Sequence, residues 1–111
     1  MDAYLINSLQ MKQDIVRLPV TEMGCVAGVS GMIYGKNFLN ANPNKRVAVV
    51  SVEAPTATFQ LENFSMENIV SAAIFGDGAA SVILSSYKAD KGPMIIAVSY
   101  THLTLPTTPY V

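Results

Sequence analysis

The sequence predicts an α/β fold in which strands and helices alternate along the chain. The clearest strand is residues 47–52, a β-branched run without period-two alternation, which is typical of a strand covered on both faces. The clearest helix is residues 26–39, where apolar residues lie at helical spacing and Asn40, Asn42 and Pro43 end the segment. From residue 15 onward the predicted order is strand, helix, strand, helix, strand, which implies right-handed crossover connections.

Three observations describe the first half of the chain. Residues 2–9 predict a short amphipathic helix, and residues 15–21 predict a strand in which Pro19 favours an edge or a terminus. Glycines then recur at intervals of four, three and four, at Gly24, Gly28, Gly31 and Gly35. Each glycine inside a helix costs about 1 kcal/mol relative to alanine. A glycine-lined face therefore predicts close approach of another backbone, and a helix buried on several sides.

The second half of the chain is read from its caps and turns. Residues 53–63 predict a loop, and Ser65 predicts the N-cap of a helix that ends near Phe75. The Gly-Asp-Gly sequence at residues 76–78 predicts a tight turn whose glycines take positive φ angles. Residues 79–84 predict another apolar strand.

Composition limits the functional classes. The chain has 111 residues, enough for one domain, and it is 50% hydrophobic and 14% charged, which predicts a packed core. A net charge of −1 without charge runs argues against a nucleic-acid or anionic-membrane partner. No apolar stretch reaches the roughly 20 residues of a membrane helix, and no signal peptide is recognised, so a cytoplasmic protein is expected. A single cysteine and a single histidine predict neither a disulfide nor a metal site.

Cys25 is the first candidate for chemistry. It directly follows a predicted strand and lies in the first turn of the central helix, where backbone N–H groups and the helix dipole lower the pKa of a thiol. A thiolate is both a nucleophile and a good leaving group. A free cysteine is also among the most often buried residues, so from position alone a structural role is the more common outcome.

Three blocks of sequence carry a family resemblance. They read RLPVTEMGCVAGVSGMIYGKNFL, RVAVVSVEAPTATFQ and NIVSAAIFGDGAASVIL, and they place Phe75 50 residues after Cys25. Together they resemble the middle of a type III polyketide synthase, the chalcone synthase-like branch of the thiolase fold, and most of all its bacterial members. The resemblance implies a partial thiolase-like fold around a buried glycine-faced helix.

The resemblance also implies a reaction. The thiolate of Cys25 would take an acyl group from acyl-CoA, and the acyl-enzyme would condense with the enolate formed by decarboxylating malonyl-CoA. Repeated extension and cyclisation would release a pyrone or a phenolic product. Acyl-CoA and malonyl-CoA are substrates in this scheme, no cofactor is implied, and the full-length enzyme is expected to be a homodimer.

Further residues receive roles from the same resemblance. The expected substrate-binding residues are Phe75, Thr56, Thr58, Gly76, Asp77 and Gly78. Phe75 would lie where the CoA tunnel meets the cavity and would orient the malonyl group, and the Gly-Asp-Gly turn would shape the back of the active site. The two threonines lie on the loop that would line the elongation cavity. A core role for Phe75 and ordinary loop roles for the threonines are the alternatives.

Parts of the family pattern are missing from this sequence. The decarboxylating histidine and asparagine of the family come from its C-terminal half, and His102 lies outside the resemblance. Residues 1–97 are therefore expected to be an internal segment of the N-terminal thiolase-like domain, with Met1 an internal methionine or the mark of a broken reading frame. Residues 98–111 resemble the translation of a sequencing-library adapter and are expected to be a non-native tail.

Two other interpretations stay open at this stage. A 3-oxoacyl-ACP synthase III-type condensing enzyme shares a cysteine at a helix N-terminus and a similar glycine-rich turn, although Met23 before Gly24 and Cys25 favours the polyketide branch. The second interpretation is a non-catalytic or unfolded α/β segment. On either reading of the family, no condensing activity is expected from the isolated 111 residues.

Overall fold

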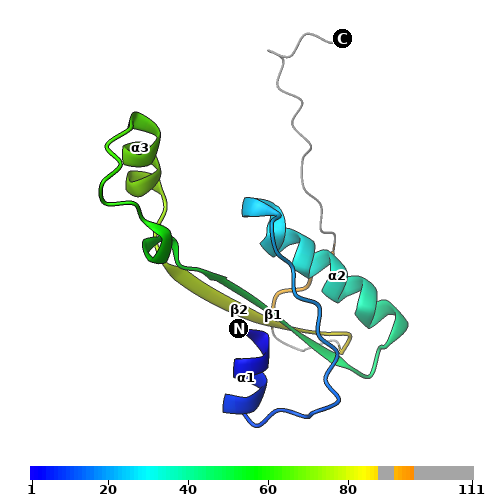
Figure 1. Ribbon diagram of the computed structural model, residues 1–111. Helices are drawn as coiled ribbons and strands as arrows, with labels where there is room; N and C mark the ends of the chain where they lie inside the picture. Colours follow the sequence, from blue (N-terminus) through cyan, green and yellow to red (C-terminus); the bar gives the residue numbers. More distant parts are fainter. Residues whose placement is uncertain (88–91, 97–111) are drawn as a thin grey trace.

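The computed structural model describes residues 1–87 and 92–96, and its organising feature is a β-hairpin that carries one long helix (Figure 1). Strands β1 (Arg46–Glu53) and β2 (Gly78–Ser85) pair antiparallel, with register running from Arg46↔Ser85 to Glu53↔Gly78. Helix α2 (Ala27–Ala41) packs on one face of this hairpin. We call η1, α2, β1 and β2 together the body.

Glycines on α2 make its close approach to the hairpin possible. A Cβ atom built on Gly31 would lie 3.0 Å from Val49 Cγ1, and one built on Gly35 would lie 2.9 Å from Leu84 Cδ1. At Gly28 the nearest atom would be Ser51 Oγ at 3.6 Å. The predicted glycine face therefore exists and contacts the sheet. Gly24 does not belong to it, because a Cβ there would meet nothing within 4 Å.

The core of the described residues is small. Leu39 is 5% exposed and Leu84 is 8% exposed, and they are the buried apolar side chains of the described ranges. Alternate residues of a strand point to opposite faces, so Val50 and Val52 lie on the face away from α2, where they are 47% and 42% exposed. The predictions that β1 is covered on both faces and α2 on several sides are therefore wrong for the described residues.

Residues 54–77 leave the hairpin as a projecting segment, which we call the arm. The arm contains the 3₁₀ helix η2 (Pro55–Thr58) and helix α3 (Met66–Ile74). As predicted, Ser65 caps α3: its Oγ accepts a hydrogen bond from Asn68 N at 3.3 Å. Figure 1 shows the arm extending from the end of the hairpin where Glu53 pairs with Gly78, and α3 packs on no other described helix or strand.

The chain before α2 is less regular than predicted. Helix α1 (Asp2–Ser8) forms as expected, but residues 15–21 form no strand and the chain stays irregular until η1 (Gly24–Val26). A strand needs a neighbour for its backbone hydrogen bonds, and the described residues offer this segment none. No helix within the described ranges is long and apolar enough to cross a membrane.

Two predictions about β1, β2 and their connection are also wrong. The strands run antiparallel, so the connection is not a right-handed crossover; α3 does not pack back on the sheet, as the helix of a crossover must. Neither Gly76 nor Gly78 takes a positive φ, and Gly78 is already extended in β2, where it pairs with Glu53. The predicted tail at residues 98–111, including His102, lies outside the described residues.

Candidate functional site

The direction of α2 places Cys25 at the end of the hairpin from which the arm extends. Gly28 lies against Ser51 and Gly35 against Val47, so α2 runs antiparallel to β1 and begins near the end of that strand. Cys25 precedes Gly28 by about one helical turn, or roughly 5 Å along the axis. We call this end, where Glu53 pairs with Gly78, the arm end.

A sharp backbone turn presents Cys25. Glu22 and Gly24 both have φ of 60°, in the left-handed region. A non-glycine residue in this region is strained by about 1 to 2 kcal/mol, and such strain concentrates at functional sites. Cys25 itself is exposed and lies within η1, which continues directly into α2. No side chain caps η1 or the start of α2, and the first N–H group of α2, that of Ala27, donates to Gly24 O within the continuous helix.

Thr56 and Asp77 meet at the base of the arm. Asp77 Oδ1 accepts a hydrogen bond from Thr56 N at 3.0 Å, and Asp77 Oδ2 accepts one from Thr56 Oγ1. The hydroxyl bond, and next the backbone bond, favour the ionised carboxylate and hold the pKa of Asp77 below its usual 3.8, while desolvation opposes them more weakly. Two residues that the sequence analysis predicted as separate site candidates are thus hydrogen-bonded to each other. We call this pair of bonds the Thr56–Asp77 link.

The other nominated residues flank the link. Thr58 follows Thr56 by two positions, and its Oγ1 donates to Pro55 O at 3.1 Å within η2. Phe75 precedes Asp77 by two positions, ends α3 and is 56% exposed. A Cβ atom on Gly76 or Gly78 would meet nothing within 4 Å, so no described neighbour requires glycine at either position.

The candidate residues share one end of the hairpin. Within the described part of the chain, no side-chain hydrogen bond joins Cys25 to the link or to Phe75. A hollow of about 240 Å³ lies elsewhere, between α1 and the irregular segment that follows it. Its lining residues are Ala3, Ile6, Asn7, Gln13, Ile15 and Arg17. The hollow therefore does not belong to the candidate site.

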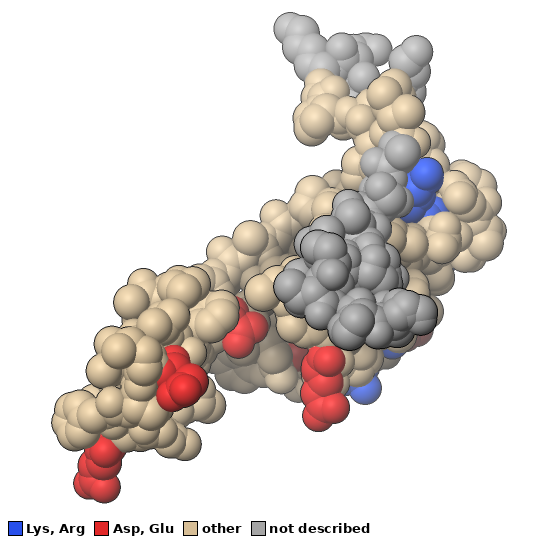
Figure 2. All heavy atoms as spheres, turned by 90° about the horizontal axis from the view of Figure 1, so that it is seen from above, with Lys and Arg blue, Asp and Glu red and all other residues tan. Residues whose placement is uncertain are grey.

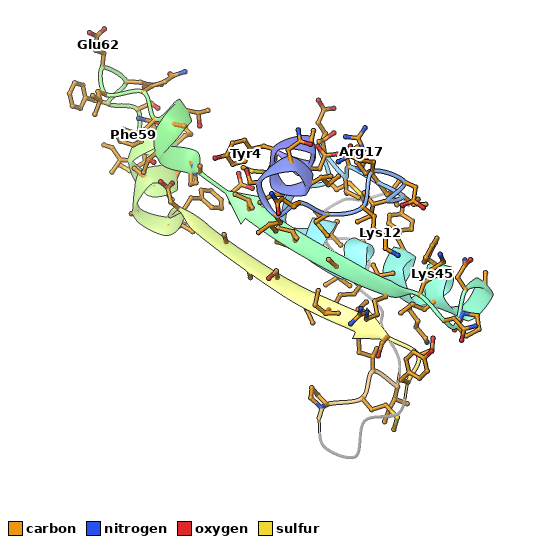
Figure 3. All side chains as sticks on the ribbon, turned by 90° about the horizontal axis from the view of Figure 1, so that it is seen from below. Tyr4, Lys12, Arg17, Lys45, Phe59 and Glu62 are labelled. Atoms are coloured by element: carbon orange, nitrogen blue, oxygen red, sulfur yellow. The ribbon has the colours of Figure 1, made fainter. Side chains whose placement is uncertain are left out.

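Charge is distributed unevenly between the arm and the opposite end of the hairpin. Residues 47–87 contain four acidic residues and no lysine or arginine. Figure 2 shows acidic side chains over the arm and basic ones toward the other end, and Figure 3 places Phe59 and Glu62 on the arm, far from Lys45. The candidate residues therefore include a thiol, two hydroxyls and an aromatic ring, and the arm carries no lysine or arginine.

Asn68 is a structural residue of the arm that the sequence analysis did not single out. Its Nδ2 donates to Asn63 O at 2.7 Å and to Gln60 O at 3.1 Å, which ties the start of α3 to the preceding loop. The signal was present in the cluster of Asn63, Ser65 and Asn68, because such side chains commonly bond to nearby backbone groups.

Comparison with known proteins identifies the family. The model of the chalcone and stilbene synthase N-terminal domain matches residues 1–88. The chain belongs to this family. A putative chalcone synthase of Bacillus subtilis is 34% identical over 90 residues, covering 81% of this chain and 25% of the relative. The 1,3,6,8-tetrahydroxynaphthalene synthase of Streptomyces peucetius is 34% identical over 106 residues, covering 93% of this chain and 28% of the relative.

Solved structures of type III polyketide synthases share the fold. The 1,3,6,8-tetrahydroxynaphthalene synthase of Streptomyces coelicolor gives a TM-score of 0.73 at 23% identity, over 78% of this chain and 25% of that one. The type III polyketide synthase domain of Steely1 from Dictyostelium gives 0.69 at 29% identity, over 77% and 23%. The predicted family and partial thiolase-like fold are confirmed, and the chalcone synthase branch is favoured over the 3-oxoacyl-ACP synthase III branch. The chain spans about a quarter of the length of the curated relatives it matches.

Proposed function

We propose that this segment belongs to an enzyme that extends an acyl-CoA starter with malonyl-CoA, and that Cys25 carries the growing chain as a thioester. The observation that carries the proposal is the position of Cys25: it is exposed, it lies in η1 directly before α2, and it is at the same end of the hairpin as Thr58 and Phe75. The names of relatives support it, among them a phloroglucinol synthase of Pseudomonas fluorescens and type III polyketide synthase A of Arabidopsis thaliana.

The proposed chemistry needs a thiolate twice. The sulfur of Cys25 attacks the carbonyl carbon of acyl-CoA, the bond from that carbon to the CoA sulfur breaks, and CoA leaves as a thiol after taking a proton. Malonyl-CoA then loses CO₂, and its enolate carbon attacks the thioester. The bond between the acyl carbon and Cys25 breaks, and the thiolate is regenerated. Phe75 would contact the malonyl group, and Thr58 would line the space for the growing chain.

Several parts of the proposed enzyme come from outside the described residues. The acidic arm has no cation for the phosphates of CoA, and the donors that stabilise the enolate are also expected from the rest of a longer protein. The proposal includes a cytoplasmic homodimer and no metal or cofactor, as the family resemblance implies. Because the histidine and asparagine that stabilise the enolate are expected from the rest of a longer protein, the isolated chain is expected to be inactive.

A chimeric enzyme tests the proposal. Residues 1–88 replace the matching segment of the Streptomyces peucetius synthase, and product formation from malonyl-CoA is measured. The chimera should form the naphthalene product, and Cys25→Ala should lower the rate at least about a thousand-fold because the acyl-enzyme cannot form. Ser8→Ala, at an exposed position on α1, is the matched control and should keep the activity.

Two results would contradict the proposal. One is a Cys25→Ala chimera that keeps its product yield. The other is a chimera that unfolds at the same temperature as the parent enzyme, and is as helical by circular dichroism, yet makes no product with Cys25 in place.

A further inference from the structure

The Thr56–Asp77 link occupies a special place in the chain path. The last strand pair is Glu53↔Gly78; on one side of the arm Asp77 directly precedes Gly78, and on the other Thr56 lies three residues after Glu53. The link therefore closes the base of the arm, much as a further pair of strand residues would. Residues 57–76, the rest of the arm between the two linked residues, project beyond the link.

The arm has few other contacts that could set its direction. Helix α3 packs on no other described helix or strand, and none of its residues is buried. Large apolar side chains along the arm are 44% to 81% exposed, among them Phe59, Leu61, Phe64 and Met66. The hydrogen bonds of Asn68 act within the arm and do not connect it to the body. The strand pairing and the Thr56–Asp77 link are therefore what hold the arm to the hairpin.

The chemistry of the link suits a carboxylate. Thr56 presents two donors on one side, its backbone N–H and its hydroxyl, and each oxygen of Asp77 accepts one of them. Hydrogen bonds to an ionised acceptor are roughly twice as strong as bonds between neutral groups. An alanine at position 77 would leave both donors without this acceptor, whereas a serine at position 56 would keep both of them.

We propose that Asp77 is a positioning residue, which locks the base of the arm and thereby holds Thr58 and Phe75 in register with each other beside the acyl chain. The inference rests on the proposed function of Cys25. Thr58 lies two residues beyond one end of the link and Phe75 two residues before the other, so opening the link releases both from a common anchor. Small misplacements of groups around a reacting chain can change rates a hundred-fold.

The test uses the chimeric synthase with two separate readouts, acylation of Cys25 and the ratio of full-length product to shorter, prematurely released pyrones. Asp77→Ala should lower this ratio about ten-fold, and by more than it lowers the rate of acylation. Thr56→Val keeps the backbone donor and should lower the ratio less than Asp77→Ala does. Thr56→Ser keeps both donors, so its product ratio should be close to that of the unmodified chimera. Glu62→Gln, at an exposed acid on the arm that forms no ion pair with another described residue, is the matched control and should keep the ratio.

The outcomes separate the two proposals. Failure of Cys25 to become acylated in the unmodified chimera overturns the proposed function. Normal acylation with an unchanged product ratio in Asp77→Ala overturns the role of Asp77. Additive effects in the Asp77→Ala, Thr56→Val double variant would also overturn it, because residues that act through one link must be non-additive.

The link can be checked by NMR independently of activity. Because its pKa is lowered, Asp77 should stay ionised as the pH falls through 3.8, and the stability that the link contributes should be lost only at lower pH. In a pH titration of the chimera, the Thr56 amide proton should shift with a midpoint below 3.8, and the midpoint of Asp77 should return toward 3.8 in Thr56→Val. If the chemical shift of the Thr56 amide proton does not change as Asp77 titrates, the hydrogen bond between them is not formed and the link is contradicted.

Discussion

The body and the arm are held by different forces. In the body, a glycine-lined helix face brings α2 against the hairpin and buries Leu39 and Leu84. The arm buries no apolar side chain among the described residues and depends on hydrogen bonds, chiefly those of Asn68 and the Thr56–Asp77 link. Apolar residues nevertheless line the arm, which indicates that its covering surface comes from beyond the described residues. In the body, side chains are packed between a helix and the sheet. In the arm, the secondary structure is formed, but its apolar side chains are not packed against other described residues.

The largest expected difference between the two regions is the cost of truncating an apolar side chain. Leu39→Ala removes a side chain that is 5% exposed and should cost about 2 to 5 kcal/mol in the free energy of unfolding of the chain. Phe64→Ala, at a position 81% exposed, should change it by less than about 0.5 kcal/mol. Urea unfolding followed by circular dichroism measures both. Equal costs would show that the arm is packed in solution, and the contrast between the two regions would be lost.

A smaller effect is expected within the glycine face itself. In Gly35→Ala the new Cβ would lie 2.9 Å from Leu84 Cδ1 and 3.2 Å from Val47 Cγ1, so we expect a net loss of about 1 to 2 kcal/mol after the gain in helix propensity. Gly28→Ala meets only Ser51 Oγ, at 3.6 Å, and should gain up to about 1 kcal/mol. The same unfolding measurement tests both variants. Equal stabilisation by both substitutions would mean that α2 does not lie as close to the hairpin as the structure places it.

Local signals predicted most of the secondary structure. Helix α2, the Ser65 cap of α3 and the β-branched strands all depend on residues close in sequence, and all were placed within about two residues of their observed bounds. The failures concern partners that are distant in sequence. Residues 15–21 have strand composition without a described neighbour to pair with, and strand composition alone does not give the direction of β2 relative to β1.

The sequence predicted which residues belong to the candidate site better than it predicted how those residues are arranged. The position of Cys25 near a helix start follows from where the glycine-spaced segment begins, and in the structure Cys25 lies in η1, directly before α2. The Thr56–Asp77 link joins residues 21 apart, through a hairpin register that spacing does not reveal. Gly76 and Gly78 lack the expected positive φ; among the described residues it occurs at Glu22 and Gly24, where the chain turns to enter η1, and also at Gln10 and Gly92.

The most direct test of the account is the location of the acyl group. The chimeric synthase is incubated with hexanoyl-CoA at neutral pH, quenched in acid and digested with trypsin. Mass spectrometry should find one hexanoyl group per chain segment, on the peptide of residues 18–36 that contains Cys25, and prior treatment with iodoacetamide should prevent it. Product formation without acylation of this peptide, or acylation that persists after Cys25 is blocked, would contradict the role of Cys25.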